Sequence, residues 1–220
     1  MDSKKNRFAF GAWLFVVVFS LVGCQSVYYQ TMEKVGIHKR DILVDRVESA
    51  RDAQEEGKEQ FRSALERFSS VLNFKGGKLE DKYKQLDAEY ELSEEKANEV
   101  HDRVDAVEDV AEALFEEWQE ELDQYTNAQL RRDSANKLRQ TRDRYNKLIR
   151  AMRRAEKKMD PVLAALKDQV LYLKHNLNAK AILSLQQEFG SIKSDIAALI
   201  REMEKSIKEA DAFIKDIGSE

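Results

Sequence analysis

The sequence is poor in the residues that interrupt helices and in those that build catalytic or metal sites. Its 220 residues include one proline, one cysteine, three histidines and eight glycines. A single cysteine excludes a disulfide within the chain and a cysteine metal cluster. No alternating pattern of β-branched residues follows residue 45, so no strands are expected. These shortages favour an all-α fold.

The residues that are present point the same way. Charged residues make up 35% of the chain, and Ala, Glu, Lys, Leu and Arg dominate, which is typical of long helices and coiled coils. The net charge is −4, and it becomes −6 if residues 1–23 are removed. Nucleic-acid binding relies on positive fields, so we expect no nucleic-acid partner.

The N-terminus has the layout of a secretion signal. Three basic residues come first: Lys4, Lys5 and Arg7. An uncharged apolar run of 15 residues follows, at positions 8–22. This run is shorter than the roughly 20 residues of a spanning helix, and it matches the apolar region of a signal peptide.

The apolar run ends in Leu21, Val22, Gly23 and Cys24. This motif resembles the lipobox of bacterial lipoproteins, in which a peptidase cuts before a cysteine that carries diacylglycerol. The resemblance implies a signal peptide over 1–23 and a lipidated N-terminus and linker over 24–40. Several acyl chains such as palmitate would anchor Cys24 stably to a membrane. The alternative is an uncleaved signal anchor with an incidental cysteine.

Residue Gln25 bears on the choice of membrane. An aspartate at this position resembles the inner-membrane retention signal of enteric bacteria, and this chain has none. We therefore expect a lipid-anchored protein of the bacterial cell envelope, on the outer membrane and facing the periplasm.

Apolar residues recur at heptad spacing in four successive segments, which predicts four long helices. Their expected bounds are about 41–72, 79–126, 134–176 and 181–217. The expected seam residues include Leu43, Val47 and Phe61 in the first helix, Tyr125 at the end of the second, Leu177 at the end of the third, and Met203, Ile207, Ala210, Ile214 and Ile217 in the fourth. Short connections make neighbouring helices antiparallel. We expect one elongated antiparallel bundle domain over 41–220, with coiled-coil-like packing and a length of roughly 50–70 Å.

Four positions weaken this pattern. Gln54 and Gly57 interrupt the first apolar seam and Ser93 interrupts the second. A fold-back near residue 76 would place Gly57 close to Ser93. Pro161 falls inside the third predicted helix, where it should bend the helix or break its hydrogen bonding.

Charge and register both change after Tyr125. A turn between Thr126 and Asp133 explains the lost register, and a continuous helix with a stutter remains the alternative. Residues 85–125 carry a net charge of −14 and residues 131–158 a net charge of +9. Antiparallel packing would neutralise the basic block against the acidic one. The other interpretation is a patch for phosphate-bearing lipid or nucleic acid.

No pattern of catalytic or metal-binding residues stands out. His38, His101 and His175 lie far apart in the sequence. Asp105 and Glu108 follow His101, but carboxylates crowd that whole segment. We find no glycine-rich phosphate loop and no nucleophile motif. The expectation is a non-enzyme without cofactor or metal.

Two segments, Lys39–Val44 and Leu173–Ala179, resemble an uncharacterised proteobacterial lipoprotein family, classed as a domain of unknown function. The resemblance covers essentially the whole mature chain. It implies a helical envelope protein and offers no reaction or ligand to transfer. The polar residues of the two segments fall at opposite ends of the predicted bundle. They either cap helices or form an end-on contact with a partner.

The expected function is structural: a scaffolding lipoprotein that joins the membrane, through its lipid, to an envelope protein partner not identified by the sequence. The alternative is a periplasmic carrier or chaperone whose bundle opens to hold a lipid or an unfolded chain. A homo-oligomer is a further expectation, because Val44, Phe115 and Ile149 widen the apolar seams.

Overall fold

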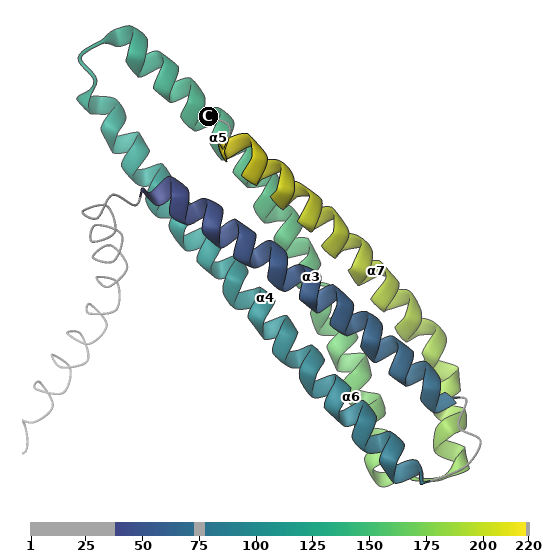
Figure 1. The fold of residues 1–220 in the computed structure, drawn as a ribbon. Coiled ribbons are helices and arrows are strands. Elements are labelled where there is room, and N and C mark those ends of the chain that lie inside the picture. Colours follow the sequence, from purple (N-terminus) through teal and green to yellow (C-terminus); the bar gives the residue numbers. More distant parts are fainter. Residues whose placement is uncertain (1–37, 73–77, 219–220) are drawn as a thin grey trace, which may run out of the picture.

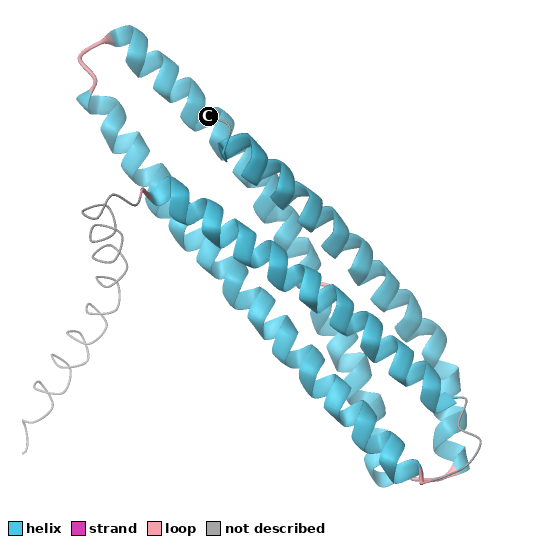
Figure 2. Ribbon diagram, viewed as in Figure 1, coloured by secondary structure: helices cyan, strands magenta, loops and turns pink. Residues whose placement is uncertain are grey.

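The computed structural model describes residues 38–72 and 78–218, and every regular element in these ranges is a helix (Figure 2). In chain order these are α3 (Lys39–Leu72), α4 (Leu79–Glu121), the 3₁₀ turn η1 (Leu122–Gln124), α5 (Ala128–Glu156), α6 (Met159–His175) and α7 (Ala179–Gly218). The prediction of an all-α bundle is confirmed. Among the described helices none is long and apolar enough to cross a membrane.

The helices form an elongated four-sided bundle (Figure 1). Helix α3 packs between α4 and α7, and α5 followed by α6 makes up the fourth side. Neighbours are antiparallel: the Arg40 guanidinium donates to the Ile217 carbonyl at one end, and the Gln186 amide donates to the Leu72 carbonyl towards the other. The 43 residues of α4 alone span about 65 Å at 1.5 Å per residue.

The apolar seams form one continuous core along the rod. In α3 the predicted seam residues Leu43, Val47 and Phe61 are fully buried. In the second half of α7, Met203, Ala210 and Ile217 are buried as predicted, but the positions between them are taken by Ser206 and Phe213. The predicted Ile207 and Ile214 are only half-buried beside them. Both phases keep heptad spacing, so the choice between them depends on how the helix is rotated against its neighbours.

The turn after η1 corrects the predicted start of the third helix. Helix α5 begins at Ala128 and not at residue 134. The Asn127 side chain accepts hydrogen bonds from the backbone N–H groups of Gln129 and Leu130, at 2.9 and 3.2 Å. This N-cap satisfies two amides that the first helical turn leaves unpaired, which starts the helix without a glycine or proline. Tyr125, predicted as a core residue, is 40% exposed.

The single predicted helix 134–176 is in fact two helices, as the proline suggested. Helix α5 ends at Glu156, and Lys157 and Lys158 form a turn before α6. Pro161 has no N–H to donate to the Lys157 carbonyl, and its ring clashes with that carbonyl in a regular helix. The Lys158 N–H bonds instead to the Ala155 carbonyl at 3.0 Å, a tighter three-residue step.

The first of the predicted weak layers contains buried polar atoms without partners. Gln54 is fully buried, and neither its side-chain oxygen nor its nitrogen has a hydrogen bond to a described residue. The Ser206 hydroxyl on α7 is likewise buried and has no hydrogen bond to a described residue. A buried polar group without a partner costs about 1–3 kcal/mol. The layer is therefore a weak point in an otherwise apolar core.

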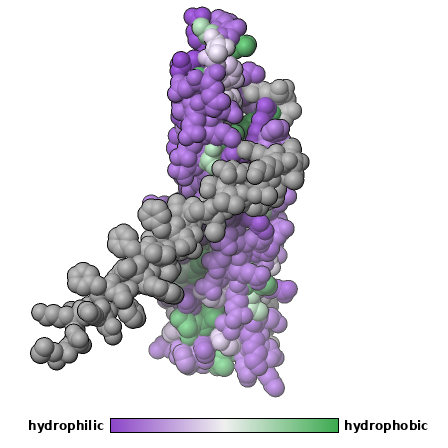
Figure 3. All heavy atoms as spheres, turned by 90° about the vertical axis from the view of Figure 1, so that its left-hand side faces the viewer, coloured by the Kyte–Doolittle hydropathy of each residue, from purple (hydrophilic) through white to green (hydrophobic). Residues whose placement is uncertain are grey.

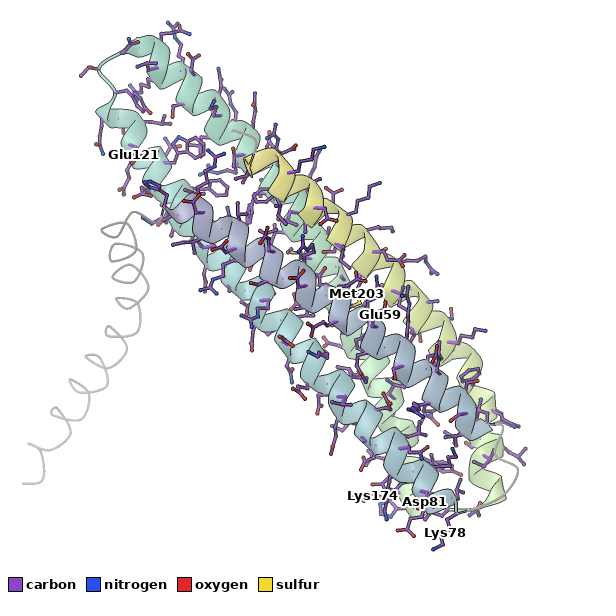
Figure 4. All side chains as sticks on the ribbon, in the orientation of Figure 1. Glu59, Lys78, Asp81, Glu121, Lys174 and Met203 are labelled. Carbon is purple, nitrogen blue, oxygen red and sulfur yellow. The ribbon has the colours of Figure 1, made fainter. Side chains whose placement is uncertain are left out.

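The second weak layer allows helices to approach closely. A Cβ placed on Gly57 would lie 3.1 Å from Met203 Cε and 3.6 Å from Val100 Cγ2. Figure 4 labels Met203 on α7, which lies beside α3. The predicted approach of Gly57 to Ser93 is not seen as a contact: the α4 atom next to the Gly57 Cβ position belongs to Val100, and no Ser93 atom lies within 4 Å of it. Ser93 lies instead beside Gln60, with 3.4 Å between Oγ and Nε2.

Replacing the unpaired glutamine should stabilise the bundle. We expect Gln54→Met, which keeps length and shape, to raise the free energy of unfolding by about 1–2 kcal/mol, since it removes buried polar atoms that have no partner. Gln60→Met is the matched control, because the Gln60 amide donates to the Glu89 carboxylate at 3.0 Å. It should give no gain. Equal effects of the two substitutions in urea denaturation would show that Gln54 is hydrogen-bonded in solution.

Candidate functional site: the two ends of the rod and the helix break

One end of the rod carries a projecting hairpin. The end of α4, η1 and the first turns of α5 extend past the start of α3 and the end of α7 (Figure 1). Lys39 at the start of α3 pairs with Glu117, and Arg144 on α5 pairs with Asp216 near the end of α7. The chain beyond these pairs has two helices instead of four. On α5 the 16 residues 128–143 lie beyond Arg144, and at roughly 1.5 Å per helical residue they span about 24 Å.

Two cations secure the start of α3 at the base of this hairpin. Lys39 is 8% exposed, and its Nζ donates to Glu117 Oε1 at 2.9 Å. Arg40 binds the Ile217 carbonyl, one of the carbonyls that the end of α7 leaves without an intrahelical partner. The polar residues of the first family-like segment therefore join helices at their ends, as the capping interpretation predicts.

A shallow cavity of about 450 Å³ opens beside this junction. It is lined by His38, Lys39, Arg40, Leu114, Glu117, Trp118 and Glu121. Figure 4 labels Glu121 at this base of the hairpin. The Trp118 indole N–H donates to the Ser134 hydroxyl at 2.8 Å, which links α4 to α5. At the tip, Leu130 is 54% exposed.

The opposite end of the rod exposes a set of large apolar side chains. They lie on the last turns of α6, in the turn to α7 and on its first turns: Leu171, Tyr172, Leu177 and Leu183. Leu183 is 59% exposed and Leu177 is 44% exposed, although the heptad pattern placed Leu177 in the core. The correction has a local cause: α6 ends at His175, so Leu177 is no longer on a helix. We call these four residues the distal apolar cluster.

The polar residues of the second family-like segment cap a helix at this distal end. The Asn176 side-chain amide donates to the Tyr172 carbonyl at 2.9 Å, and the Asn176 backbone N–H bonds to the Leu173 carbonyl. These bonds satisfy carbonyls at the end of α6. Capping therefore accounts for Asn176 here, and the two segments lie at opposite ends as predicted. Figure 3 shows exposed hydrophobic side chains near the lower end of one face.

Four arginines of the basic block form ion pairs with neighbouring elements. Arg131 pairs with Asp123, and the Arg153 guanidinium binds both Asp105 and Glu108 on α4. This confirms the predicted pairing of the basic and acidic blocks. Two other arginines of α5 pair with α7, through Arg144–Asp216 and Arg154–Glu202. Sequence reasoning did not foresee the pairing with α7, because net charges near neutrality hide individual carboxylates.

A charged network surrounds His101 at the helix break. His101 Nδ1 lies 2.5 Å from Glu156 Oε1 on α5, and its Nε2 lies 3.4 Å from Asp105 Oδ2. Arg153 also contacts Glu156, at 2.7 Å. The hydrogen bond to Glu156 raises the pKa of His101 above its ordinary value, with help from Asp105. Glu156 could have been suspected from the sequence, as the last acidic residue of a strongly basic segment.

A cavity of about 240 Å³ adjoins this network, lined in part by Asn98, Glu156 and Asp160. Its groups can hold and release a proton at His101. Across the described ranges, no group of three or more His, Cys, Asp or Glu side chains could hold a metal ion.

Two residues expected to widen the apolar seams, Phe115 and Ile149, are buried in the core, at 6% and 9% exposure. They therefore offer no apolar surface for a homo-oligomer.

The remaining predicted site residues lie outside the described ranges. These are Leu21, Val22, Gly23 and Cys24, together with the signal peptide over 1–23 and most of the linker over 24–40.

The His101 network should make stability depend on pH. A raised folded-state pKa means that the protonated form is stabilised by folding, so the contribution is fully present below the unfolded pKa of about 6.5 and is lost as pH rises through the folded value. We expect His101→Gln to lower the free energy of unfolding most below pH 6.5, and less at higher pH.

The same pH dependence should disappear in Glu156→Gln, because that substitution removes the main cause of the shift. Adding His101→Gln to the Glu156→Gln variant should then cause no further loss in the free energy of unfolding. Urea denaturation between pH 5 and 9 measures this. A difference between wild type and His101→Gln that stays constant over this range would refute the prediction.

Comparison with known proteins adds the family. No curated protein and no solved structure gives a significant match to the chain. One family model matches residues 28–217, which is most of the sequence and includes all the helices except the last residue of α7. Its description is "Protein of unknown function (DUF2959)". The closed antiparallel bundle with a projecting hairpin is therefore the fold of a member of this family, to which the chain belongs.

Proposed function

We propose that the chain is a non-catalytic structural lipoprotein of the bacterial cell envelope, anchored through acyl chains on Cys24 to the outer membrane and facing the periplasm. The observation that carries this proposal is the polarity of the rod. Residue 38 enters the bundle at the hairpin end, and the distal apolar cluster lies at the other end. A tether at one end leaves the other free to meet a partner.

The length of the linker fits this arrangement. Thirteen residues, 25–37, separate Cys24 from the first described residue. Even fully extended they reach at most about 45 Å. The hairpin end is thereby kept near the membrane, and a rod of about 65 Å carries the distal cluster into the space beyond.

The distal cluster has the character of a contact surface. Exposed apolar patches on a protein surface commonly mark interaction sites. Leu171, Leu177 and Leu183 are each more than 40% exposed within one end of the rod. Other exposed large apolar side chains in the described ranges are Leu92 on α4 and Tyr125 and Leu130 at the hairpin. The distal end therefore has more of them than the hairpin end, which favours it as the surface for an envelope protein partner.

Lipid anchoring is tested first. We expect Cys24→Ser to leave an uncleaved precursor and to abolish labelling by radioactive palmitate, because the thioether that carries the diacylglycerol cannot form. Mass spectrometry of the N-terminal peptide of the wild type should give an acylated Cys24. A wild-type chain that begins at Met1 without acylation would support the uncleaved signal anchor instead.

The contact surface is tested by cross-linking in the native cells. A photoreactive residue at the exposed Lys180 should give a discrete adduct with an envelope protein, and Leu177→Glu with Leu183→Glu should abolish it. Leu130→Glu is the matched control, since Leu130 is equally an exposed leucine but lies at the hairpin tip. All three substitutions should change the stability by less than about 0.5 kcal/mol. The opposite result, an adduct that persists with Leu177→Glu and Leu183→Glu but is lost with Leu130→Glu, would mean that the hairpin end and not the distal end contacts the partner.

A second function is favoured by the unpaired polar atoms of Gln54 and Ser206. A carrier or chaperone needs a bundle that opens, and a weak core layer lowers the cost of opening. Hydrogen exchange separates the two functions. Fast exchange of amides around this layer favours the carrier, whereas uniformly slow exchange through it favours the rigid scaffold.

A further inference from the structure

The helix break creates a cavity on the side of the bundle that faces α7. Its volume is about 440 Å³, within the range of ligand-binding pockets. It is lined by Arg154, Lys157, Lys158, Pro161, Glu202 and Lys205. This cavity, which we call the break cavity, lies apart from the hairpin end and from the distal apolar cluster.

The break itself assembles these residues. In an unbroken helix, Lys157 and Lys158 would continue the surface of α5. Here they occupy a turn, followed by Pro161 in the first turn of α6. The N-cap residue of α6, Lys158, makes no side-chain capping bond. The last carbonyls of α5 lie next to the first amides of α6, so the two helix ends add little net charge, and the cationic side chains determine the charge of the break cavity.

The charge in the break cavity is strongly positive. Four cationic side chains line it against one carboxylate, that of Glu202. Glu202 accepts from Lys205 at 2.7 Å and lies 3.6 Å from Arg154 Nε. The hydrogen bond from Lys205 lowers the pKa of Glu202, so this carboxylate is ionised at neutral pH and neutralises a single positive charge.

Lys157 and Lys158 are exposed and have no ion pair with any described residue. In this they differ from Arg153, which pairs with α4, and from Arg154, which pairs with Glu202 on α7. Asp160, the acidic residue of the first turn of α6, lines the cavity beside His101 on the α4 side and not this one. The excess positive charge of the break cavity is therefore not compensated from within the bundle.

The lining of the break cavity favours one class of anion over others. Arginine and lysine together bind phosphate well, through charge-assisted hydrogen bonds. The Pro161 ring and the methylene stems of the cationic side chains supply an apolar wall. The geometry points to a binding site for a phosphate-bearing anion, in which Lys157, Lys158 and Arg154 hold the phosphate and Pro161 contacts the rest of the molecule.

The proposal is tested on the full chain in non-ionic detergent micelles at near-physiological ionic strength. Two probes distinguish the source of the phosphate: inorganic pyrophosphate, and phosphatidic acid incorporated in the micelles with phosphatidylcholine as its zwitterionic counterpart. Acetylation of lysines followed by mass spectrometry reports which amines are protected. Calorimetry measures the affinity for pyrophosphate.

We expect one of the probes to protect Lys157 and Lys158 more than Lys147 and Lys193, two exposed lysines that line none of the cavities described above. Protection by pyrophosphate identifies a soluble phosphate ligand. Protection by phosphatidic acid alone identifies a lipid headgroup. The paired variant Lys157→Gln and Lys158→Gln should weaken binding about tenfold, or abolish the protection of Lys205.

The matched control removes the same charge elsewhere, with Lys147→Gln and Lys193→Gln, and should weaken binding much less. Equal weakening by the two pairs would overturn the proposal, because it would mean attraction by net charge alone. Equal protection of Lys147, Lys157, Lys158 and Lys193 from acetylation, or protection of none of them, would also overturn the proposal. Circular dichroism checks that each variant is folded, and Lys205→Gln provides an independent test from α7 should the paired variant fail to fold.

Discussion

Burial of apolar stripes between long helices is the interaction on which the whole structure depends. Each helix presents an apolar seam at heptad spacing, and no seam can be removed from water except against another helix. Residues such as Leu43, Val100 and Leu199 are fully buried in one continuous core. Because that core runs along the rod, features that distinguish one part of the molecule from another are confined to its ends, its surface and the few places where the packing fails.

The most informative failure is at Pro161. One missing N–H and one steric clash split a long helix into α5 and α6. The break places two lysines in a turn that faces α7, and Glu156, the last residue of α5, lies next to His101 on α4. A cavity lies on each side. A single residue thus converts a uniform helix surface into two chemically different sites, a basic one and one that contains a histidine.

The ends of the rod differ for a simpler reason, which is helix length. The hairpin of α4 and α5 outruns α3 and α7, so at that end polar bonds such as Trp118–Ser134 take the place of a four-helix core. At the other end the chain turns at Asn176, although apolar residues continue beyond it, and leucines such as Leu177 and Leu183 are left exposed. The two ends of the rod therefore differ physically. The chain enters the bundle at the hairpin end, and exposed apolar side chains lie at the other end.

The sequence alone determined the all-α class, the four seams, the buried glutamine and the break near Pro161, because periodicity and proline chemistry are local properties. It also indicated that the acidic and basic blocks pair. Tertiary packing decided the rest. The rotation of α7 chose Ser206 over Ile207, and the register of α3 against α4 placed Gly57 opposite Val100. The His101–Glu156 contact and the break cavity join residues from different helices, and such distances depend on how rods are aligned, which no local pattern records.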